Sequence, residues 1–176
     1  MTTKAGSNSI LVFNVGPLGA LSARPVVRAE DGTVPFAVAF DARGHLLVAD
    51  AGPNAVATYS VRPDGTLLPL SVTPTGQAAT CWIAVSGRLA VASNAGSGTV
   101  TRFALDRAGR TTRLGDTPAG GGTVDAAFSR DGRFLYVQSG AAGQVTAFAV
   151  RSDGSVAARG TVTVPDAVGG EGIVAW

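Results

Sequence analysis

An aromatic residue recurs along this chain at nearly constant intervals. It stands at positions 13, 59, 103 and 148, which lie 46, 44 and 45 residues apart, and in each copy a glycine follows six residues later. The aromatics are Phe13, Tyr59, Phe103 and Phe148, and the glycines are Gly19, Gly65, Gly109 and Gly154. A repeat of about 45 residues is typical of arrays that stack one supersecondary unit several times. The fixed offset from aromatic to glycine predicts a β-hairpin in every copy.

A second hairpin repeats between these copies. The apolar run 36–40, a turn ending at Gly44 and the run 46–49 match 124–128, a turn ending at Gly132 and 134–137. Runs that are apolar throughout are typical of strands covered on both faces. Each unit is therefore expected to be four antiparallel strands, an inner pair and then an outer pair, as in a blade of a β-propeller. The expected strands lie near 36–40, 46–50, 55–61, 81–85, 89–93, 99–104, 124–128, 133–138 and 144–150.

The fold class predicted from these repeats is all-β. The chain of 176 residues is expected to form a partial or half β-propeller, with about three complete four-stranded blades plus parts of a fourth. Residues 1–8 are predicted to be a disordered tail, and 9–176 the propeller segment, with repeat units starting near 9, 55, 99 and 144. The propeller segment is expected to begin with an outer pair near 9–15 and 20–28 and to end on an innermost strand near 172–176.

Composition restricts the classes of function. Apolar residues make up 45% of the chain, charged residues 15%, and the net charge is only +2, which favours a soluble protein and no nucleic-acid partner. No apolar run is long enough to span a membrane and the first ten residues lack a hydrophobic signal segment, so a cytoplasmic location is favoured. Cys81 is the single cysteine and Lys4 the single lysine, and no cofactor or metal motif is present, so we expect no cofactor and no metal.

Three phrases carry a family resemblance: 92–100 (ASNAGSGTV), 128–137 (FSRDGRFLYV) and 169–175 (GGEGIVA). They resemble the bacterial lactonase-type seven-bladed β-propellers, which include 6-phosphogluconolactonases. Seven blades need about 315 residues, so the chain resembles the C-terminal half of such a protein. This leaves three arrangements open: a closed four-bladed ring, a pair of copies forming eight blades, or an open arc. Uncovered blade faces favour self-association.

Polar residues fall in the two classes of loop that open on one end of a propeller. The connections into inner strands carry Thr33, Gln77, Thr80, Thr123, Asp125 and Glu171, and the connections from inner to outer pairs carry Asp50, Asn94 and Gln138 as equivalent positions. Loops of these classes meet around the axial channel, where a small lactone or sugar could bind. Asp125 and Glu171 are the catalytic acid/base candidates. The alternative interpretation is loop capping by Asp125 and simple solvation of Glu171.

Other reactive side chains are weaker candidates. His45 is expected to be a solvated hairpin residue and Cys81 a buried apolar one. The resemblance implies basic and histidine residues around the channel, whereas 34–36, 79–81 and 123–125 contain neither. Two hypotheses follow. The favoured one is a lactonase-family propeller segment without robust catalysis of its own, and the alternative is a hydrolase that opens a small lactone at the axial channel.

Overall fold

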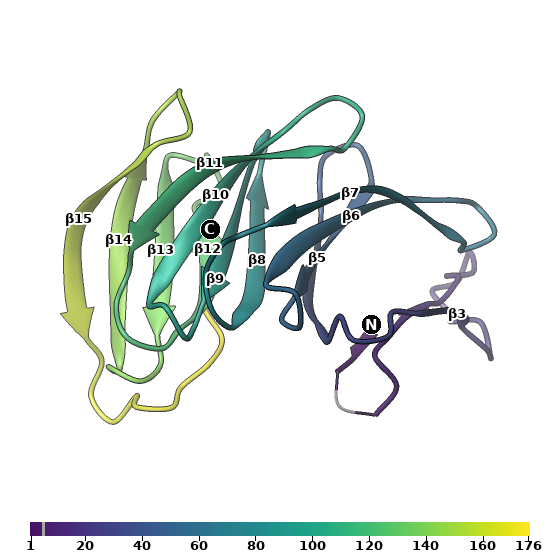
Figure 1. Ribbon diagram of the computed structural model, residues 1–176, viewed down its shortest axis with the longest axis horizontal. Coiled ribbons are helices and arrows are strands. Elements are labelled where there is room, and N and C mark those ends of the chain that lie inside the picture. Colours follow the sequence, from purple (N-terminus) through teal and green to yellow (C-terminus); the bar gives the residue numbers. More distant parts are fainter. Residues whose placement is uncertain (5) are drawn as a thin grey trace.

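The computed structural model describes residues 1–4 and 6–176, and they form four antiparallel sheets arranged as an open arc (Figure 1). The first sheet has three strands and the other three sheets have four strands each, paired in chain order. No described segment forms a helix that could cross a membrane. The strands are β1 Thr2–Thr3, β2 Ser9–Val12, β3 Val26–Ala29, β4 Pro35–Phe40, β5 His45–Asp50, β6 Ala55–Val61, β7 Leu67–Pro74, β8 Thr80–Ser86, β9 Leu89–Asn94, β10 Thr99–Leu105, β11 Thr111–Pro118, β12 Thr123–Phe128, β13 Phe134–Ser139, β14 Gln144–Val150 and β15 Val156–Thr163.

The repeated glycine makes the hairpin between the two outer strands of each sheet. Between β6 and β7, Gly65 has φ +85°, a left-handed conformation in which a side chain is strained. The Gly65 N–H donates to the carbonyl of Arg62, and the Asp64 carboxylate accepts from the Thr66 N–H at 2.9 Å. Aspartate before glycine therefore closes the turn locally, which is why these two residues mark the hairpin in the sequence.

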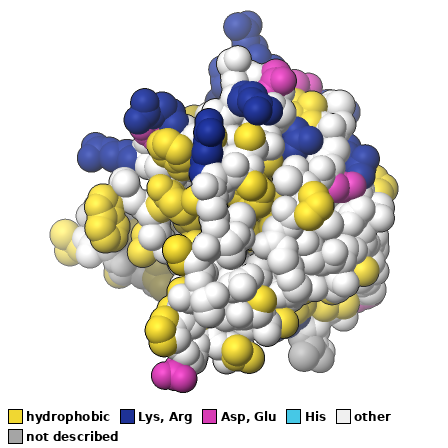
Figure 2. Space-filling view, turned by 90° about the vertical axis from the view of Figure 1, so that its left-hand side faces the viewer, with side chains coloured by type: hydrophobic (Ala, Val, Ile, Leu, Met, Phe, Trp, Pro, Cys, Tyr) yellow, Lys and Arg dark blue, Asp and Glu magenta, His cyan; other side chains and the backbone are white. Residues whose placement is uncertain are grey.

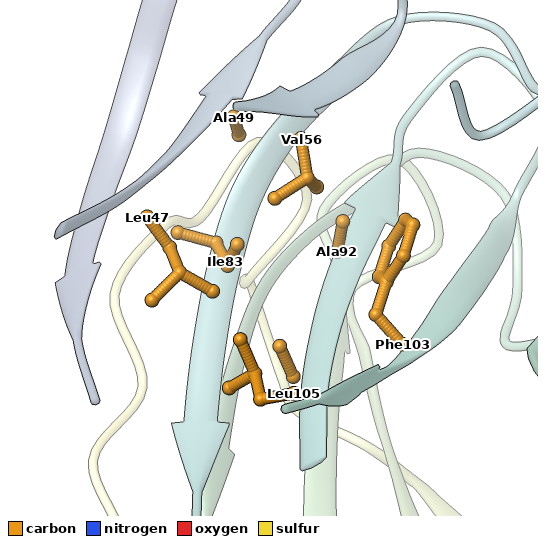
Figure 3. Close-up of a cluster of buried hydrophobic side chains, with 8 residues drawn as sticks. Leu47, Ala49, Val56, Ile83, Ala92, Phe103 and Leu105 are labelled. Atoms are coloured by element: carbon orange, nitrogen blue, oxygen red, sulfur yellow. The ribbon is translucent and has the colours of Figure 1, made fainter. Parts of the chain in front are cut away.

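The hydrophobic core lies between neighbouring sheets. Leu47 and Val56 of the second sheet pack against Ile83 and Phe103 of the third, and all four side chains are at most 5% exposed (Figure 3). A matching cluster joins the third and fourth sheets, and a smaller one joins the first and second. Apolar side chains on both faces of a strand are thus buried, because each inner sheet has a neighbour on either side. This packing explains the continuous apolar runs in the sequence.

The inner strands β4, β8 and β12 lie side by side along the concave edge of the arc, with β1 next to β4. The all-β partial propeller predicted from the repeats is confirmed, and each of the nine predicted strands overlaps an observed one. Strands β2, β6, β10 and β14 begin at Ser9, Ala55, Thr99 and Gln144. Each of these is the first strand of an outer pair. The sheets themselves begin earlier in the chain, with β1, β4, β8 and β12.

Three details of the termini differ from the sequence-based prediction. Within the expected tail 1–8, Thr2–Thr3 forms β1 and pairs with Ile10 and Ser9, because β2 offers a free backbone edge there. The second N-terminal strand is Val26–Ala29 and not 20–28, because the hairpin before it is long and is held by a bridge from Val15 to Leu21. The segment 172–176 is not a strand, because no described strand pairs with it.

The last sheet forms one end of the arc. Figure 2 views the molecule from this side, where hydrophobic side chains gather below a group of basic side chains, drawn in dark blue. Large hydrophobic residues in this part of the chain are unusually exposed: Val162 at 62%, Val168 at 75%, Val174 at 77% and Trp176 at 91%. In the interior of the arc, the corresponding face of each sheet is covered by the next sheet.

Candidate functional site

The inner strands bring a small pocket to the concave edge of the arc. It has a volume of about 180 Å³ and is lined by Thr2, Lys4, Phe36, Ala37 and Trp82. The Lys4 ammonium lies 3.8 Å from the centre of the Phe36 ring, a cation–π contact. The pocket therefore combines two aromatic rings with the one lysine of the chain. We call it the channel pocket.

Asp125 of β12 is a buried carboxyl group close to this pocket, because the Trp82 side chain lines the pocket and also neighbours Asp125. Asp125 is 4% exposed. Its Oδ1 accepts from the Ala126 N–H at 2.7 Å, and its Oδ2 accepts from the Ile173 N–H at 2.9 Å. Burial raises the pKa of Asp125, and the two backbone hydrogen bonds offset part of that rise. Both oxygens of this carboxyl group are thus already engaged with backbone donors.

The second acid/base candidate, Glu171, is solvent-exposed. Its negative charge contributes to raising the pKa of Asp125 and of Cys81, so the three residues share one electrostatic environment. Cys81 is 8% exposed, and burial is the main cause of its raised pKa. Its Sγ lies 3.9 Å from the carbonyl of Ser93. A buried thiol with a raised pKa is a poor nucleophile.

Three of the predicted ligand residues belong to one hydrogen-bond network in the third sheet. The Asn94 Oδ1 accepts from the Thr80 hydroxyl at 2.7 Å, and its Nδ2 donates to the Thr101 hydroxyl at 2.9 Å. Gln77 Nε2 donates to the Asp116 carboxylate at 3.0 Å. Asp116 in turn accepts from the Thr101 hydroxyl at 2.8 Å. Asn94 and Thr80 are fully buried, so their polar groups face each other and not a channel.

Two further predicted residues, Thr33 and Thr123, close turns. The Thr33 hydroxyl donates to the carbonyl of Glu30 at 2.8 Å, and the Thr123 hydroxyl donates to the carbonyl of Gly120 at 2.7 Å. Neither side chain lines the channel pocket. Their hydroxyl groups stabilise the connections into β4 and β12.

The predicted equivalence of Asp50, Asn94 and Gln138 is wrong by one residue in the last sheet. Asp50 pairs with Pro35, Asn94 with Thr80, and Ser139 with Thr123, so the residue equivalent to Asp50 and Asn94 is Ser139. The spacing to the repeated aromatic could have shown this, because Asp50, Asn94 and Ser139 each stand nine residues before it, whereas Gln138 stands ten before it. Gln138 lies one position earlier, where its buried Oε1 has no partner among the described residues.

Asp50 itself is 3% exposed, and its Oδ1 has no hydrogen-bond partner in the described part of the chain. Burial, followed by the nearby charge of Glu30, raises the pKa of Asp50 to about 7. Glu30 is paired with Arg28 and accepts from the Tyr59 hydroxyl at 3.0 Å. This group of side chains lies between the first and second sheets and is separate from the channel pocket.

The structure also shows which residues sequence reasoning missed. Lys4, Phe36 and Trp82 line the channel pocket, but Lys4 was assigned to a tail, and the two aromatics are indistinguishable in sequence from core residues. His45 is held by Asp41, with Nδ1 and Oδ2 2.8 Å apart, and its ring packs against Gly109. Residues 1–4 and 6–176 hold no group of three or more His, Cys, Asp or Glu side chains suited to a metal ion.

Comparisons with solved structures support the fold. A protein from Lactobacillus plantarum shares 23% identity at a TM-score of 0.78, with 89% of this chain and 53% of that chain covered. A candidate 6-phosphogluconolactonase from Bacteroides uniformis shares 19% identity at 0.79, with 90% and 53% covered. The periplasmic gluconolactonase of Pseudomonas aeruginosa shares 22% identity at 0.76, with 92% and 51% covered. This chain thus spans about half the length of these structures.

Sequence comparison gives the family directly. No curated protein matches the chain. The family model described as "Lactonase, 7-bladed beta-propeller" matches residues 1–122, which is more than half of the chain. The four sheets of the arc are arranged as blades of such a propeller, in agreement with this match. The chain therefore belongs to the lactonase family of seven-bladed β-propellers.

Proposed function

We propose that the channel pocket binds a small lactone or sugar, and that the 176-residue chain does not hydrolyse it at an enzymatic rate on its own. The observation that carries this proposal is the state of Asp125, whose two carboxylate oxygens each accept a backbone N–H. A general base must lie within hydrogen-bond reach of the water from which it takes a proton. Asp125 is 4% exposed, so little water reaches it, and the two backbone donors stabilise its ionised form and oppose its protonation.

The binding half of the proposal rests on the lining of the pocket. Trp82 and Phe36 offer apolar ring faces, which suit the C–H face of a sugar or lactone ring. Lys4 supplies hydrogen-bond donors and one positive charge beside them. A volume of about 180 Å³ suits one small ring and not a longer chain of sugars. The names of the similar lactonases are consistent with a ligand of this class.

We expect no turnover because the described residues near the pocket do not provide both of the groups that lactone hydrolysis needs. Ring opening needs an activated water and stabilisation of the oxyanion. Glu171 is exposed and the Cys81 thiol is buried, so neither is placed to activate a water at the pocket. Lys4 is the one cation among the residues that line the pocket. A doubly charged phosphosugar lactone would require more positive charge than a single ammonium group. The alternative, hydrolysis with Asp125 as the base, is favoured by its raised pKa alone.

Binding and turnover can be measured separately. A Trp176→Phe background leaves Trp82 as the single tryptophan, so its fluorescence reports on the pocket. We expect saturable quenching by gluconolactone, loss of that response to ligand in Lys4→Ala, and an unchanged response in the surface control Val72→Ala. We also expect no hydrolysis of 6-phosphogluconolactone above the buffer rate. An acceleration of about 10⁶-fold that Asp125→Asn abolishes would establish the hydrolase alternative.

A further inference from the structure

Within residues 1–4 and 6–176, the first sheet has no inner strand. Its order is β1-β2-β3, whereas each of the other sheets has four strands. The pairs Thr2–Ile10 and Thr3–Ser9 correspond to Ala49–Val56 and Asp50–Ala55 in the second sheet. β1 therefore takes the place of the second strand of a blade. Its other edge, which faces the place of the inner strand, has no strand partner among the described residues.

The C-terminal segment 171–176 has the sequence of an inner strand but pairs with no described strand. Its sequence, EGIVAW, aligns with TVDAAF of β12, so that Ile173 corresponds to Asp125 and Trp176 to Phe128. Ile173 lies beside Asp125, to which it donates its N–H at 2.9 Å, and Asp125 in turn lies beside Trp82 of the preceding inner strand. The segment thus continues the row of inner strands, yet Val174 and Trp176 remain 77% and 91% exposed.

An apolar pocket marks the place where β1 stops. Its volume is about 250 Å³, and its walls include Met1, Leu11 and Phe13 together with Val38 and Phe40 of β4. Along β4, Val38 and Phe40 face this pocket, whereas Ala37 and Ala39 pack on the cluster between the second and third sheets. Side chains of a strand alternate between faces in this way. A strand added along β1 would therefore direct every second side chain toward the second sheet.

We propose that segment 171–176 of one copy adds to β1 of a second copy and completes the first sheet of that copy. The second sheet provides the register, because Pro35 pairs with Asp50 and Val38 with Val48. Transferred to the aligned residues, Glu171 of one copy lies opposite Thr3 of the other, and Val174 lies opposite Met1. By the same alternation, Ile173 and Ala175 face the second sheet and cover the apolar pocket.

A second copy fits the edge because segment and edge do not pair with each other in the open arc that the structure shows. Asp125 holds the segment beside the last sheet, and the first sheet lies at the other end of the arc (Figure 1). A free strand edge and an unpaired apolar strand are each a recognised route to pairing between chains. When two copies exchange these segments, both free edges are paired at once, in a closed two-fold assembly.

Cysteine cross-linking tests both the partner and the register. We would introduce Thr3→Cys and Glu171→Cys in a Cys81→Ala chain, because paired residues on neighbouring strands lie within disulfide reach. Oxidation should then give a covalent species of twice the 17.5 kDa mass of one chain. The control combines Thr3→Cys with Val168→Cys, whose side chain is also exposed but lies outside the aligned segment, and it should stay at single-chain mass.

Two results would overturn the proposal. A disulfide within single chains would mean that the chain closes on itself as a small ring, and the absence of any cross-link would mean that segment and edge do not meet. Light scattering at micromolar concentration gives the independent measurement on the unmodified chain, for which we expect a doubled mass. Ala175→Glu should halve that mass and the exposed control Val72→Glu should not, whereas a single-chain mass for the unmodified protein would refute the assembly.

Discussion

Replacing Asp50 by asparagine should stabilise the protein at alkaline pH. The Asp50 side chain is 3% exposed, and its Oδ1 has no partner in the described structure. Its pKa is raised from 3.8 to about 7 by burial and by the charge of Glu30. Above pH 7 the folded protein must therefore hold a buried negative charge next to another carboxylate. The asparagine side chain would be neutral, like that of Asn94 at the equivalent position of the third sheet.

The pH dependence has a definite sign. Between pH 4 and pH 7 the folded state binds the Asp50 proton and the unfolded state does not, so the free energy of unfolding falls as the pH rises through this window. A difference of about 3 pKa units corresponds to about 4 kcal/mol at most. An asparagine side chain at the same place would still bury polar atoms without hydrogen-bond partners, which costs about 1–3 kcal/mol of stability. The expected net gain for Asp50→Asn is therefore about 1–3 kcal/mol at pH 8 and close to zero at pH 5.

Urea denaturation followed by tryptophan fluorescence at pH 5, 6, 7 and 8 measures this difference. Asp125 also has a pKa raised by burial, so the variant should show a weaker dependence on pH and not a flat one. Asp64→Asn is the matched control, because hydrogen bonds to Thr66 lower the pKa of that carboxyl group. It should give no gain at pH 8. Equal pH profiles for the unmodified chain and Asp50→Asn would refute the reasoning.

Three other predictions concern local structure. Asn94→Ala should lower the free energy of unfolding by about 2–4 kcal/mol, measured by urea denaturation, because it removes two hydrogen bonds of a fully buried side chain and leaves a cavity in its place. Gly98→Ala should lower the melting temperature more than Gly19→Ala, because both have positive φ but only at Gly98 would a Cβ lie 2.8 Å from a backbone oxygen, that of Gly120. Cys81 should react with a thiol reagent only as fast as the protein opens, and rapid labelling of the folded protein would contradict its burial and raised pKa.

The blades could be predicted from sequence because their signals are local and repeated. Tyr59 and Phe103 begin the same hairpin in successive copies, and Gly65 and Gly109 have the positive φ that its turn requires. The ends of the chain lack such repetition. Thr2–Thr3 has no apolar alternation and is a strand only because β2 offers an edge. Segment 172–176 has the composition of an inner strand, but no strand in the described part of the chain pairs with it.

The candidate site was less predictable, because polar side chains such as Thr and Gln at the channel end can either bind a ligand or form hydrogen bonds within the protein. Thr80 and Gln77 were expected to face a ligand, yet their polar groups are hydrogen-bonded within the third sheet and its neighbouring connections. Lys4 and Trp82 line the channel pocket because β1 and β8 place them there. Only Asp125 was both singled out from the sequence and found close to the pocket, and its hydrogen bonds from the Ala126 and Ile173 N–H groups correspond to the capping role given as its alternative interpretation.

The buried position at the end of β5, β9 and β13 shows how copies of one framework diverge. Asn94 is satisfied because Thr80 and Thr101 supply hydroxyl groups from the strands on either side. At the matching places the second sheet has Pro35 and Ala57, which offer no side-chain partner to Asp50. The fourth sheet instead has Ser139, whose hydroxyl donates to the carbonyl of Ala119 at 2.8 Å. The polar residue tolerated at each blade end therefore depends on the partners in its own sheet and the preceding connection. For Asn94 and Ser139 these partners explain the polar side chain without a ligand, whereas the Oδ1 of Asp50 has no such partner among the described residues.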